Sequence, residues 1–523
     1  MSTMSLPEHP DLDQLRRQAK ELLDAARSGD PVALERIAAH APGERPQRLA
    51  TAQLVLAREH GFASWPKLRA EVIDRTAGLA ELIDAFLYES VAGRDDRPVR
   101  LLREHPSITT QDFRAAVVSG DADALRPMLV GDPGLATRPD RRTGWPPLLG
   151  VCMSRWHHLD PVNLAAGLCE VARLLLDAGA DPNTTVGGRP GRPEYCSTLF
   201  AAAGLQANAE LTELLLDRGA TPDAHTVYLA AFHADHRPLE LLLERGAPVD
   251  DTALAAPLTT GDAEVTRLLL AAGADAARLI PPAALGEGDP GDLPVPVAVR
   301  NGHSAELVEL LLTHGGDAST PGRDGQPPYR LAVRQGRRDL ADLLARYGAS
   351  EETTDVDDFL DACLRADRAE AKRRVAADPG LLDRLTDADR AAVHRAADNG
   401  DADAVRLLLD VGFPVNSHDG ANGATPLHVA AGAGSVDVVR LLLDRGADVA
   451  ARDTTWDSTP AVWASVGSGM HLGHTPAPDW VTTIELLISA GASVADAWLT
   501  GFKAPSPEVA DLLRAHGVTE PSG

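Results

Sequence analysis

The chain has 523 residues, of which 44% are hydrophobic and 24% are charged, proportions that are ordinary for a folded protein and exclude wholesale disorder. Aromatic residues make up only 4%, which argues against an all-β fold and favours small helices packed through leucine, alanine and valine. The 76 acidic and 50 basic side chains give a net charge of -26, so nucleic acid and anionic membranes are disfavoured partners, whereas a basic partner is favoured.

The N-terminus lacks the apolar core of a signal peptide, because the first ten residues are short and polar and the next stretch is charged. No run approaches the ~20 apolar residues of a membrane span. Four widely spaced cysteines without a CxxC pair predict buried free thiols in a reducing compartment: Cys152, Cys169, Cys196 and Cys363. We therefore expect a soluble, cytoplasmic protein with no membrane partner.

Residues 1–75 are predicted to form three or more helices. Asp11 can cap a helix that ends before Gly29, and Asp30-Pro31 can begin another. A last helix is expected to begin at 64–66, where the sequence reads Ser-Trp-Pro. We expect this segment to cap the repeats that follow by covering the apolar face of the first one.

One phrase then recurs along the chain: three aliphatic residues, two polar residues, glycine and usually alanine. Its clear copies are Leu174–Ala180, Leu214–Ala220, Leu241–Ala247, Leu268–Ala274 and Leu441–Ala447. From Gly179 to Gly348 the glycines of successive copies are 27 to 42 residues apart, a spacing typical of stacked repeats. The phrase therefore predicts a solenoid.

The copy at 425–447 shows what one unit contains. Thr425 and Pro426 can begin a short helix, and Gly434 can end it in left-handed geometry. Ser435 can cap a second helix that ends at Gly446. Two helices of this size cannot bury their apolar faces alone, so each pair must stack on its neighbours.

These residues resemble the ankyrin repeat, since the unit reads TPLHVAA and is followed by GADVAARD. The string AQLVLAREHGFASWPKL in the N-terminal segment resembles a helical segment that precedes ankyrin arrays in some bacterial proteins. The resemblance implies an all-α ankyrin-repeat solenoid of stacked helix pairs, with short hairpin fingers and several loop insertions. It also implies that His428 forms hydrogen bonds within its repeat.

The array is expected to have two parts, separated by the acidic stretch Glu351–Asp361, which carries six acidic and no basic side chains. Negative charge there suits a hinge that enters a helix at its N-terminus. The predicted organisation is a capping segment (1–75), a first sub-array (77–350), an acidic hinge (351–355), a second sub-array (356–518) and a C-terminal tail (519–523). Near Ala224, Thr252 and Asp496 the units are too short to hold a finger.

The resemblance places the residue pair before each inter-helix glycine on a concave groove that binds partners. These pairs vary in size, charge and polarity among the copies, and aromatic and arginine side chains most often carry interface energy. The expected partner-binding residues are Trp145, Phe232, His233, Arg300, Asn301, Arg334, Gln335 and Trp456, of which the two tryptophans lie near fingers. The alternative is that these helix ends vary because nothing contacts them.

A rival interpretation is an enzyme or small-molecule site built from the insertions at 155–168 and 467–480, around Trp156, His157, Trp463 and His471. Each insertion holds two histidines and an aspartate, which could bind zinc only if both insertions met: His157, His158 and Asp160 in one, His471, His474 and Asp479 in the other. A third interpretation is a spacer without a dedicated partner.

Known catalytic patterns are weak or missing. The HxxH of the second insertion lacks the fixed helical spacing of a zinc motif, and the GxGxxG at 286–291 contains acidic residues that would repel a phosphate. We therefore expect no catalytic residues, no metal and no cofactor. The favoured function is a non-catalytic scaffold that binds a protein or peptide through the groove and fingers, whereas the oligomeric state is not predicted.

Overall fold

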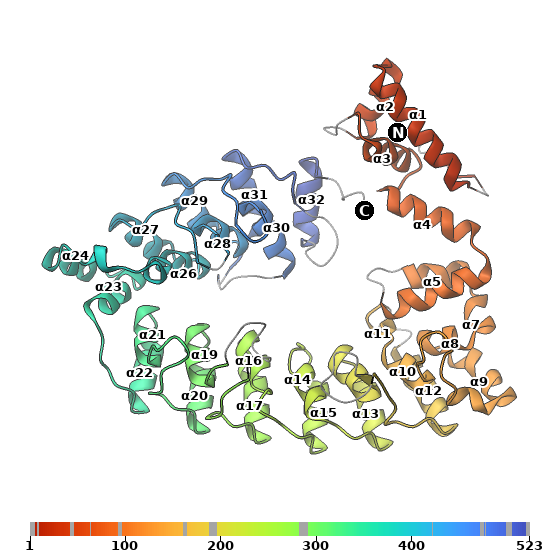
Figure 1. Ribbon diagram of the computed structural model, residues 1–523, viewed down its shortest axis with the longest axis horizontal. Coiled ribbons are helices and arrows are strands. Elements are labelled where there is room, and N and C mark those ends of the chain that lie inside the picture. The colour runs from red at the N-terminus through yellow and green to blue at the C-terminus, as the bar shows by residue number, and fades with distance from the viewer. Residues whose placement is uncertain are drawn as a thin grey trace. The chain divides into compact units, whose positions relative to one another are not determined.

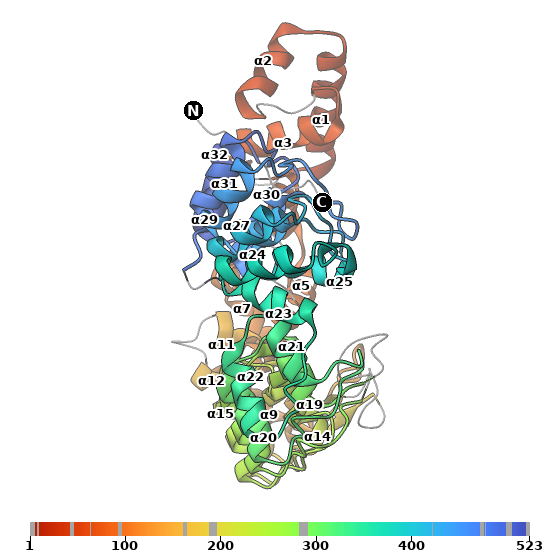
Figure 2. The same cartoon turned by 90° about the vertical axis from the view of Figure 1, so that its left-hand side faces the viewer.

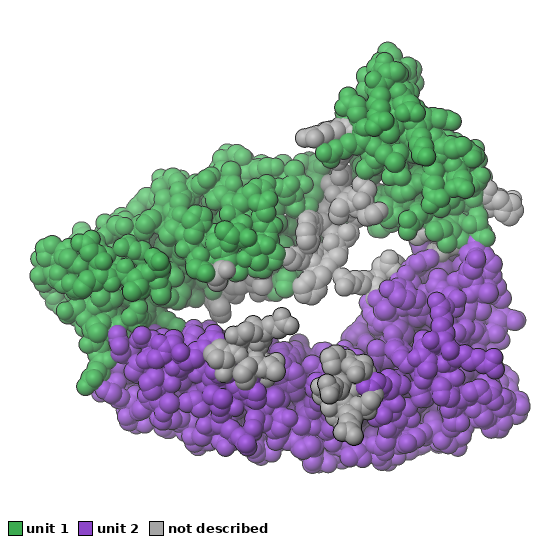
Figure 3. Space-filling view, in the orientation of Figure 1, with its two compact units in different colours: residues 1–76, 333–337, 352–523 green, residues 77–332, 338–351 purple. Residues whose placement is uncertain are grey.

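The computed structural model describes most of the chain, namely residues 6–7, 10–41, 46–62, 64–92, 97–159, 165–187, 196–281, 291–420, 422–470, 475, 477–497 and 505–518. The chain divides into two compact units, coloured separately in Figure 3. Unit 1 comprises residues 1–76, 333–337 and 352–523, and unit 2 comprises residues 77–332 and 338–351. Within the described residues, every helix is too short or too polar to cross a membrane.

The N-terminal part of unit 1 consists of α1 (Leu12–Arg27), α2 (Pro31–His40), α3 (Leu49–Glu59) and α4 (Trp65–Thr76). The predicted helix starts are confirmed: the Asp11 carboxylate accepts the N–H of Asp13 at 2.8 Å, and Asp30 accepts that of Ala33 at 3.0 Å. The core of these four helices is formed by side chains from residues 6–72, so the segment has a hydrophobic core of its own.

Unit 2 begins with α5 (Leu79–Val91), α6 (Arg97–Glu104) and α7 (Ser107–Gln111) and continues as helix pairs. The first helices of the pairs, here called the first row, are α8 (Phe113–Ser119), α10 (Pro147–Cys152), the π-helical η2 (Phe200–Leu205), α14 (Ala224–Ala230), α16 (Ala255–Thr260), α19 (Pro294–Arg300) and α21 (Pro328–Arg334). The second row is α9 (Ala122–Gly131), α12 (Ala165–Asp177), α13 (Ala209–Asp217), α15 (Arg237–Glu244), α17 (Ala263–Ala271), α20 (Ala305–Thr313) and α22 (Arg338–Arg346). The 3-10 turn η1 (Pro133–Ala136) lies between two pairs, and α11 (Trp156–Leu159) lies within one pair, between α10 and α12.

The second-row helices from α13 to α22 follow one another along one side of unit 2 in Figure 1, and they overlap in Figure 2, which looks along the row. The repeated leucine phrase ends these helices. In each clear copy of unit 2 the middle leucine is fully buried: Leu175, Leu215, Leu242 and Leu269. The glycine that follows has a positive φ, for example +97° at Gly179, which ends the helix in left-handed geometry. The predicted stacking of helix pairs is therefore confirmed.

The connections between pairs are short. Strands β1 (Thr185–Val186) and β2 (Cys196–Ser197) pair antiparallel in one finger, with Thr185 opposite Ser197. Residues 188–195, between the two strands, lie outside the described residues. Helix α14 begins seven residues after α13 ends, so the predicted loss of the finger before Ala224 is confirmed.

The second part of unit 1 contains α23 (Asp355–Leu364), α24 (Arg368–Ala377), η3 (Leu382–Arg384), α25 (Asp387–Arg390), α26 (Ala392–Asp398), α27 (Ala402–Asp410), α28 (Pro426–Gly432), α29 (Val436–Asp444), α30 (Pro460–Met470), α31 (Trp480–Ser489) and α32 (Pro507–Ala515). Thr425 is the N-cap of α28, and Gly434 has the expected left-handed backbone, with φ +66°. Ser435 precedes α29 but its hydroxyl makes no cap hydrogen bond, because it faces Gly400 of the neighbouring pair instead. The predicted insertion at 467–480 begins as helix, since α30 continues to Met470.

Candidate functional site

A cavity of about 470 Å³ opens in unit 2 between α5, α8 and the turn that leads into α10. This volume lies in the range of ligand pockets, roughly 300–1,000 Å³. Its lining is mostly apolar and includes Leu87, Tyr88, Val91, Phe113, Val117, Val118, Leu135, Pro139, Trp145, Pro146 and Pro147. A hollow of this size and polarity can accept a bulky apolar side chain or a small ligand.

Helix α5 has two apolar faces, of which one packs inside unit 2 and the other lines the cavity. One face, with Leu82, Ile83 and Phe86, is buried in the unit. Residues 84, 87, 88 and 91 follow at the spacing i, i+3, i+4, i+7, so they lie on one side of the helix, and all four line the cavity. The side chain of Tyr88 is 66% exposed, which is unusual for a large aromatic residue and leaves it available to a partner.

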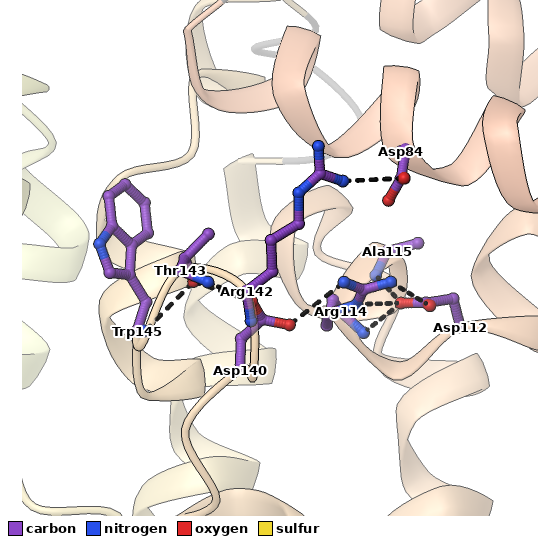
Figure 4. Close-up of polar contacts among 8 residues, drawn as sticks. All are labelled: Asp84, Asp112, Arg114, Ala115, Asp140, Arg142, Thr143 and Trp145. Atoms are coloured by element: carbon purple, nitrogen blue, oxygen red, sulfur yellow. Dashed lines mark hydrogen bonds and ion pairs between the residues drawn. The ribbon is translucent and has the colours of Figure 1, made fainter.

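The turn beside the cavity is organised by Asp140 (Figure 4). Its carboxylate accepts the N–H groups of Arg142 at 2.9 Å and Thr143 at 2.7 Å, and its own N–H donates to the main-chain oxygen of Trp145 at 2.9 Å. Gly144 closes the turn with a φ of +74°. Burial opposes ionisation of Asp140, but these bonds and the guanidinium of Arg114 hold its pKa below the ordinary value. The turn thus presents Trp145 to the cavity on a fixed backbone.

Arg114 joins this turn to α8, because its guanidinium lies between two carboxylates (Figure 4). It contacts Asp112 at 2.9 Å and Asp140 at 3.1 Å. Asp112 is also the N-cap of α8, accepting the N–H groups of Arg114 at 2.8 Å and Ala115 at 3.2 Å. The hydrogen bond to Asp112 is the main cause that raises the pKa of Arg114 above its ordinary value. Arg114 therefore links the N-terminus of α8 to the turn at Asp140, which lies 26 residues further along the chain.

Three further arginines stand at the rim of the cavity. Arg142 pairs with Asp84 of α5 at 2.8 Å, and Arg138 pairs with Asp132 at 2.9 Å. Arg141 is exposed and has no ion-pair partner among the residues that the structure describes. The rim therefore holds as many arginines as aspartates in a protein whose net charge is -26, and within the described residues Arg141 is its unpaired cation.

Four aromatic rings, here called the aromatic row, follow one another on η2, on α14 and just after α14 in unit 2. His225 stacks on Phe200 with ring centroids 5.0 Å apart, Tyr228 follows His225 at 6.4 Å, and Phe232 meets Tyr228 edge to face at 5.2 Å. The last three occupy positions i, i+3 and i+7, so they share one side of α14 and its end. Phe232 is 37% exposed and forms the open end of the row.

Residues 363–453 match the family model of ankyrin repeats in three copies. This part of the chain consists of ankyrin repeats. A search of curated proteins found no match for this chain. The matched segment covers α24 to α29, where the structure shows the stacked helix pairs described above, and the same pairing continues along unit 2.

The predicted partner-binding residues of unit 2 fall into two groups. Trp145 lines the cavity and Phe232 ends the aromatic row. The other three contact protein groups: the Nε2–H of His233 donates to the oxygen of Gly204 at 2.8 Å, and the amide of Asn301 donates to that of Leu258 at 2.9 Å. Arg300 pairs with the buried Asp292 at 2.6 Å and with Asp324 at 3.3 Å. These three side chains therefore link neighbouring ankyrin repeats.

The remaining predicted residues belong to unit 1. Arg334 ends α21 and pairs with two buried carboxylates, Asp357 at 3.0 Å and Asp389. Burial, together with the charge of Arg334, lowers the pKa of the nearby Arg395 to about 10. Gln335 is half-buried beside Arg334. Trp456 stands at the finger after α29, 49% exposed, with its ring 5.7 Å from that of Trp463.

Only part of the rival site at the two insertions lies within the described residues. Trp156 is buried and donates its indole N–H to Ser90 at 3.0 Å, and the Nε2 of His157 lies 2.7 Å from the oxygen of Gln206. The first insertion belongs to unit 2 and the second to unit 1. Asp160, His471, His474 and most of the GxGxxG at 286–291 lie outside the described residues. Within the described part of the chain, no three metal-ligating side chains come together.

Sequence reasoning missed the cavity, including Tyr88, Arg114 and the aspartates that hold Arg114. One signal was available, because the stretch LAELIDAFLYESV has apolar residues on more than the single stripe that packing requires. Tyr228 and His225 were also missed, although their spacing with Phe232 is helical.

Proposed function

We propose that this ankyrin-repeat protein is a non-catalytic scaffold that binds a protein or peptide through its first-row helices and fingers. Ankyrin repeats in general indicate a protein-interaction scaffold. The observation that carries the proposal is the apolar cavity beside Trp145, which lies next to the exposed Tyr88 on the same face. Buried aromatic anchors in pockets supply most of the energy of protein interfaces.

The distribution of exposed aromatic side chains supports this face as the binding surface. Phe232 follows a first-row helix, and Trp456 stands on a finger four residues before α30, near the place that Trp145 takes two residues before α10. Exposed aromatic area costs free energy in water, so its retention on fingers and first-row helices favours a partner that covers it. We include Trp145, Phe232 and Trp456 as direct contacts.

His233, Arg300, Asn301, Arg334 and Gln335 complete the proposed partner-binding set. The contacts of Arg300 and Arg334 with buried aspartates hold these side chains in fixed positions. A side chain that is already ordered loses less conformational entropy when a partner binds. Their first role is to stiffen the array, and their second is to offer fixed polar groups to the partner.

The charge of -26 favours a basic partner at long range, because an acidic field speeds the association of basic proteins. The four cysteines are free thiols, which supports a reducing compartment such as the cytoplasm. We propose in addition that residues 1–75 form a capping segment, and that the acidic hinge at 351–355 separates sub-arrays at 77–350 and 356–518.

Retention of partners on immobilised full-length protein tests the proposal. We compare wild type with the double variant W145S/F232S and with V130S, a matched control because Val130 is 84% exposed on the second-row helix α9. We expect at least one protein from extract of the native cells to be retained by wild type and V130S and lost from W145S/F232S. Equal retention by all three, or retention by none, would contradict the proposed binding face.

A further inference from the structure

The cavity beside Trp145 also indicates what chemistry the partner presents, an inference that rests on the proposed function. We propose that it binds a linear peptide segment in which a bulky apolar side chain stands next to one or more carboxylates. The apolar side chain enters the cavity, and the carboxylates meet the arginine-rich turn at 138–142.

The apolar half of the motif follows from the lining. Val117 and Val118 are buried at the cavity wall, and Trp145, Pro146 and Pro147 form the other side. A volume of about 470 Å³ exceeds that of any single side chain, so the anchor brings adjacent backbone with it. Because Tyr88 and the arginines of the turn remain exposed, a ligand must extend beyond the cavity to cover the site. An extended peptide fits this requirement.

The anionic half follows from the charges at the rim. Four arginines line the cavity, and four aspartates line it or pair with these arginines: Arg114, Arg138, Arg141 and Arg142, with Asp84, Asp112, Asp132 and Asp140. Each of these aspartates is in contact with an arginine, whereas Arg141 has no ion-pair partner within the described residues. The formal charges therefore balance, and a carboxylate brought to the turn can pair with Arg141 without displacing an existing partner, since arginine can bind a carboxylate through two hydrogen bonds.

The charge of the whole chain does not oppose this local preference. The screening length is about 8 Å at physiological ionic strength, so a bound segment of a few residues responds mainly to charges at the rim. A nucleic acid would instead extend its phosphates over the acidic surface outside the turn. The acidic surface as a whole thus favours a partner that is basic overall, whereas the arginines of the turn favour an acidic segment within that partner.

The test is selection of displayed random 12-residue peptides on the full-length protein, read by sequencing. The wild type is compared with R138E/R141E, which reverses the charge of the turn, and with R406E/R440E. Arg406 and Arg440 are half-exposed on α27 and α29, so this control changes the net charge by the same amount elsewhere. A third variant, Y88A/W145A, removes aromatic area from the cavity. Circular dichroism and thermal unfolding of each variant confirm folding before selection.

We expect wild type and R406E/R440E to enrich peptides with an aromatic or large aliphatic residue beside Asp or Glu, at least tenfold over the starting library. R138E/R141E should keep the apolar preference but exchange Asp and Glu for Lys and Arg, and Y88A/W145A should lose the apolar preference. If peptides are enriched without adjacent acidic residues, or if charge reversal leaves the preference unchanged, the inference is wrong while the scaffold function stands. If no peptide is enriched on any variant, the inference is wrong, and the retention experiment on W145S/F232S decides the scaffold function separately.

Discussion

Gly432 of α28 and Gly467 of α30 bring two neighbouring first-row helices of unit 1 into main-chain contact. A Cβ atom built on Gly467 would overlap the carbonyl oxygen of Gly432. The same carbonyl oxygen accepts the indole N–H of Trp480 at 2.8 Å, so the end of the second insertion is fixed to this contact. The two helices can approach this closely because Gly467 lacks a side chain at the point of contact.

Substitution of Gly467 by alanine should therefore destabilise the protein. Alanine is favoured over glycine in a helix by about 1 kcal/mol, but forcing a methyl group into a closed contact costs roughly 1–3 kcal/mol, and here the contact is with main chain that cannot rotate away. We expect the overlap to outweigh the propensity and lower the free energy of unfolding by about 1–2 kcal/mol. Urea unfolding followed by circular dichroism measures the difference.

Gly131→Ala is the matched control. Gly131 ends α9, its φ is not positive, and a Cβ atom there would meet nothing within 4 Å. We expect this variant to match wild type or to gain up to about 1 kcal/mol. The explanation by close approach would be refuted if Gly467→Ala were as stable as Gly131→Ala.

Asn183 links its own inter-repeat turn to the next one, at residues 219–221. Replacing it should therefore destabilise both turns. Its side-chain amide donates to the oxygen of Gly219 at 2.9 Å, and its side-chain oxygen accepts the N–H of Thr221 at 2.8 Å. Each net hydrogen bond contributes about 0.5–1.5 kcal/mol, less where it is exposed to water, so Asn183→Ala should cost about 1 kcal/mol. Amide hydrogen exchange at Thr221 should accelerate.

Asn183→Asp separates the two bonds, because aspartate keeps the acceptor and loses the donor. We expect it to retain protection of the Thr221 amide and to lose only part of the stability. Unchanged exchange at Thr221 in the alanine variant would show that the turn does not depend on this side chain. Asn416 makes the same pair of contacts in unit 1, with Gly446 and Asp448, and offers a second place to repeat the measurement.

The helix boundaries were predictable from sequence because their causes are local. Asp11 and Asp30 bond N–H groups two or three residues away, and Gly29 and Gly434 mark the helix ends through their own backbone angles. The leucine phrase was equally informative, since a three-residue aliphatic run before glycine can bury its middle side chain only on a stacked helix. These features require no knowledge of which repeat lies beside which.

The candidate site was less predictable because its contacts join distant parts of the chain. Arg114 reaches Asp140 across 26 residues, and Asn301 reaches Leu258 across 43. Variation among repeats marked Asn301 and His233 as candidates for binding a partner, but it could not show that each is bonded to the preceding repeat. The cavity needs α5, α8 and a turn in one place, which only the fold supplies.

Stability should fall as pH falls from about 7 to 5.5, because several histidines are held neutral in the folded state. Burial lowers the pKa values of His394 and His428, and partial loss of hydration lowers those of His157 and His158. In the unfolded chain histidine titrates near 6.5, so below that pH the unfolded state binds more protons than the folded state. The stabilisation is complete above the unfolded pKa and is lost as pH falls toward the lowered pKa of the folded state.

His428 shows why the folded state resists protonation. Its Nδ1 accepts the N–H of Thr425 at 3.1 Å, and its Nε2 lies 3.0 Å from the oxygen of Ser458, so the neutral ring uses one nitrogen as acceptor and the other as donor. A proton on Nδ1 would face the N–H of Thr425. We expect His428→Gln to lower the melting temperature at pH 7 and to reduce its slope between pH 7 and 5.5. An unchanged slope would exclude His428 as a contributor.

Replacing Arg334 should lower the free energy of unfolding and not only weaken partner binding. Its guanidinium pairs with Asp357 and Asp389, whose side chains are 0% and 3% exposed, while its own side chain is 20% exposed. Removing one member of a buried ion pair costs about 3–5 kcal/mol, and the partial exposure of Arg334 places Arg334→Met at the lower end, about 3 kcal/mol. Trp456→Ala removes a side chain that is 49% exposed but contacts the ring of Trp463, and it should lower the free energy of unfolding by about 1 kcal/mol. Chemical unfolding of both variants measures the difference. Equal free energies of unfolding would mean that the ion pairs of Arg334 contribute little to stability and that its role lies only in partner binding.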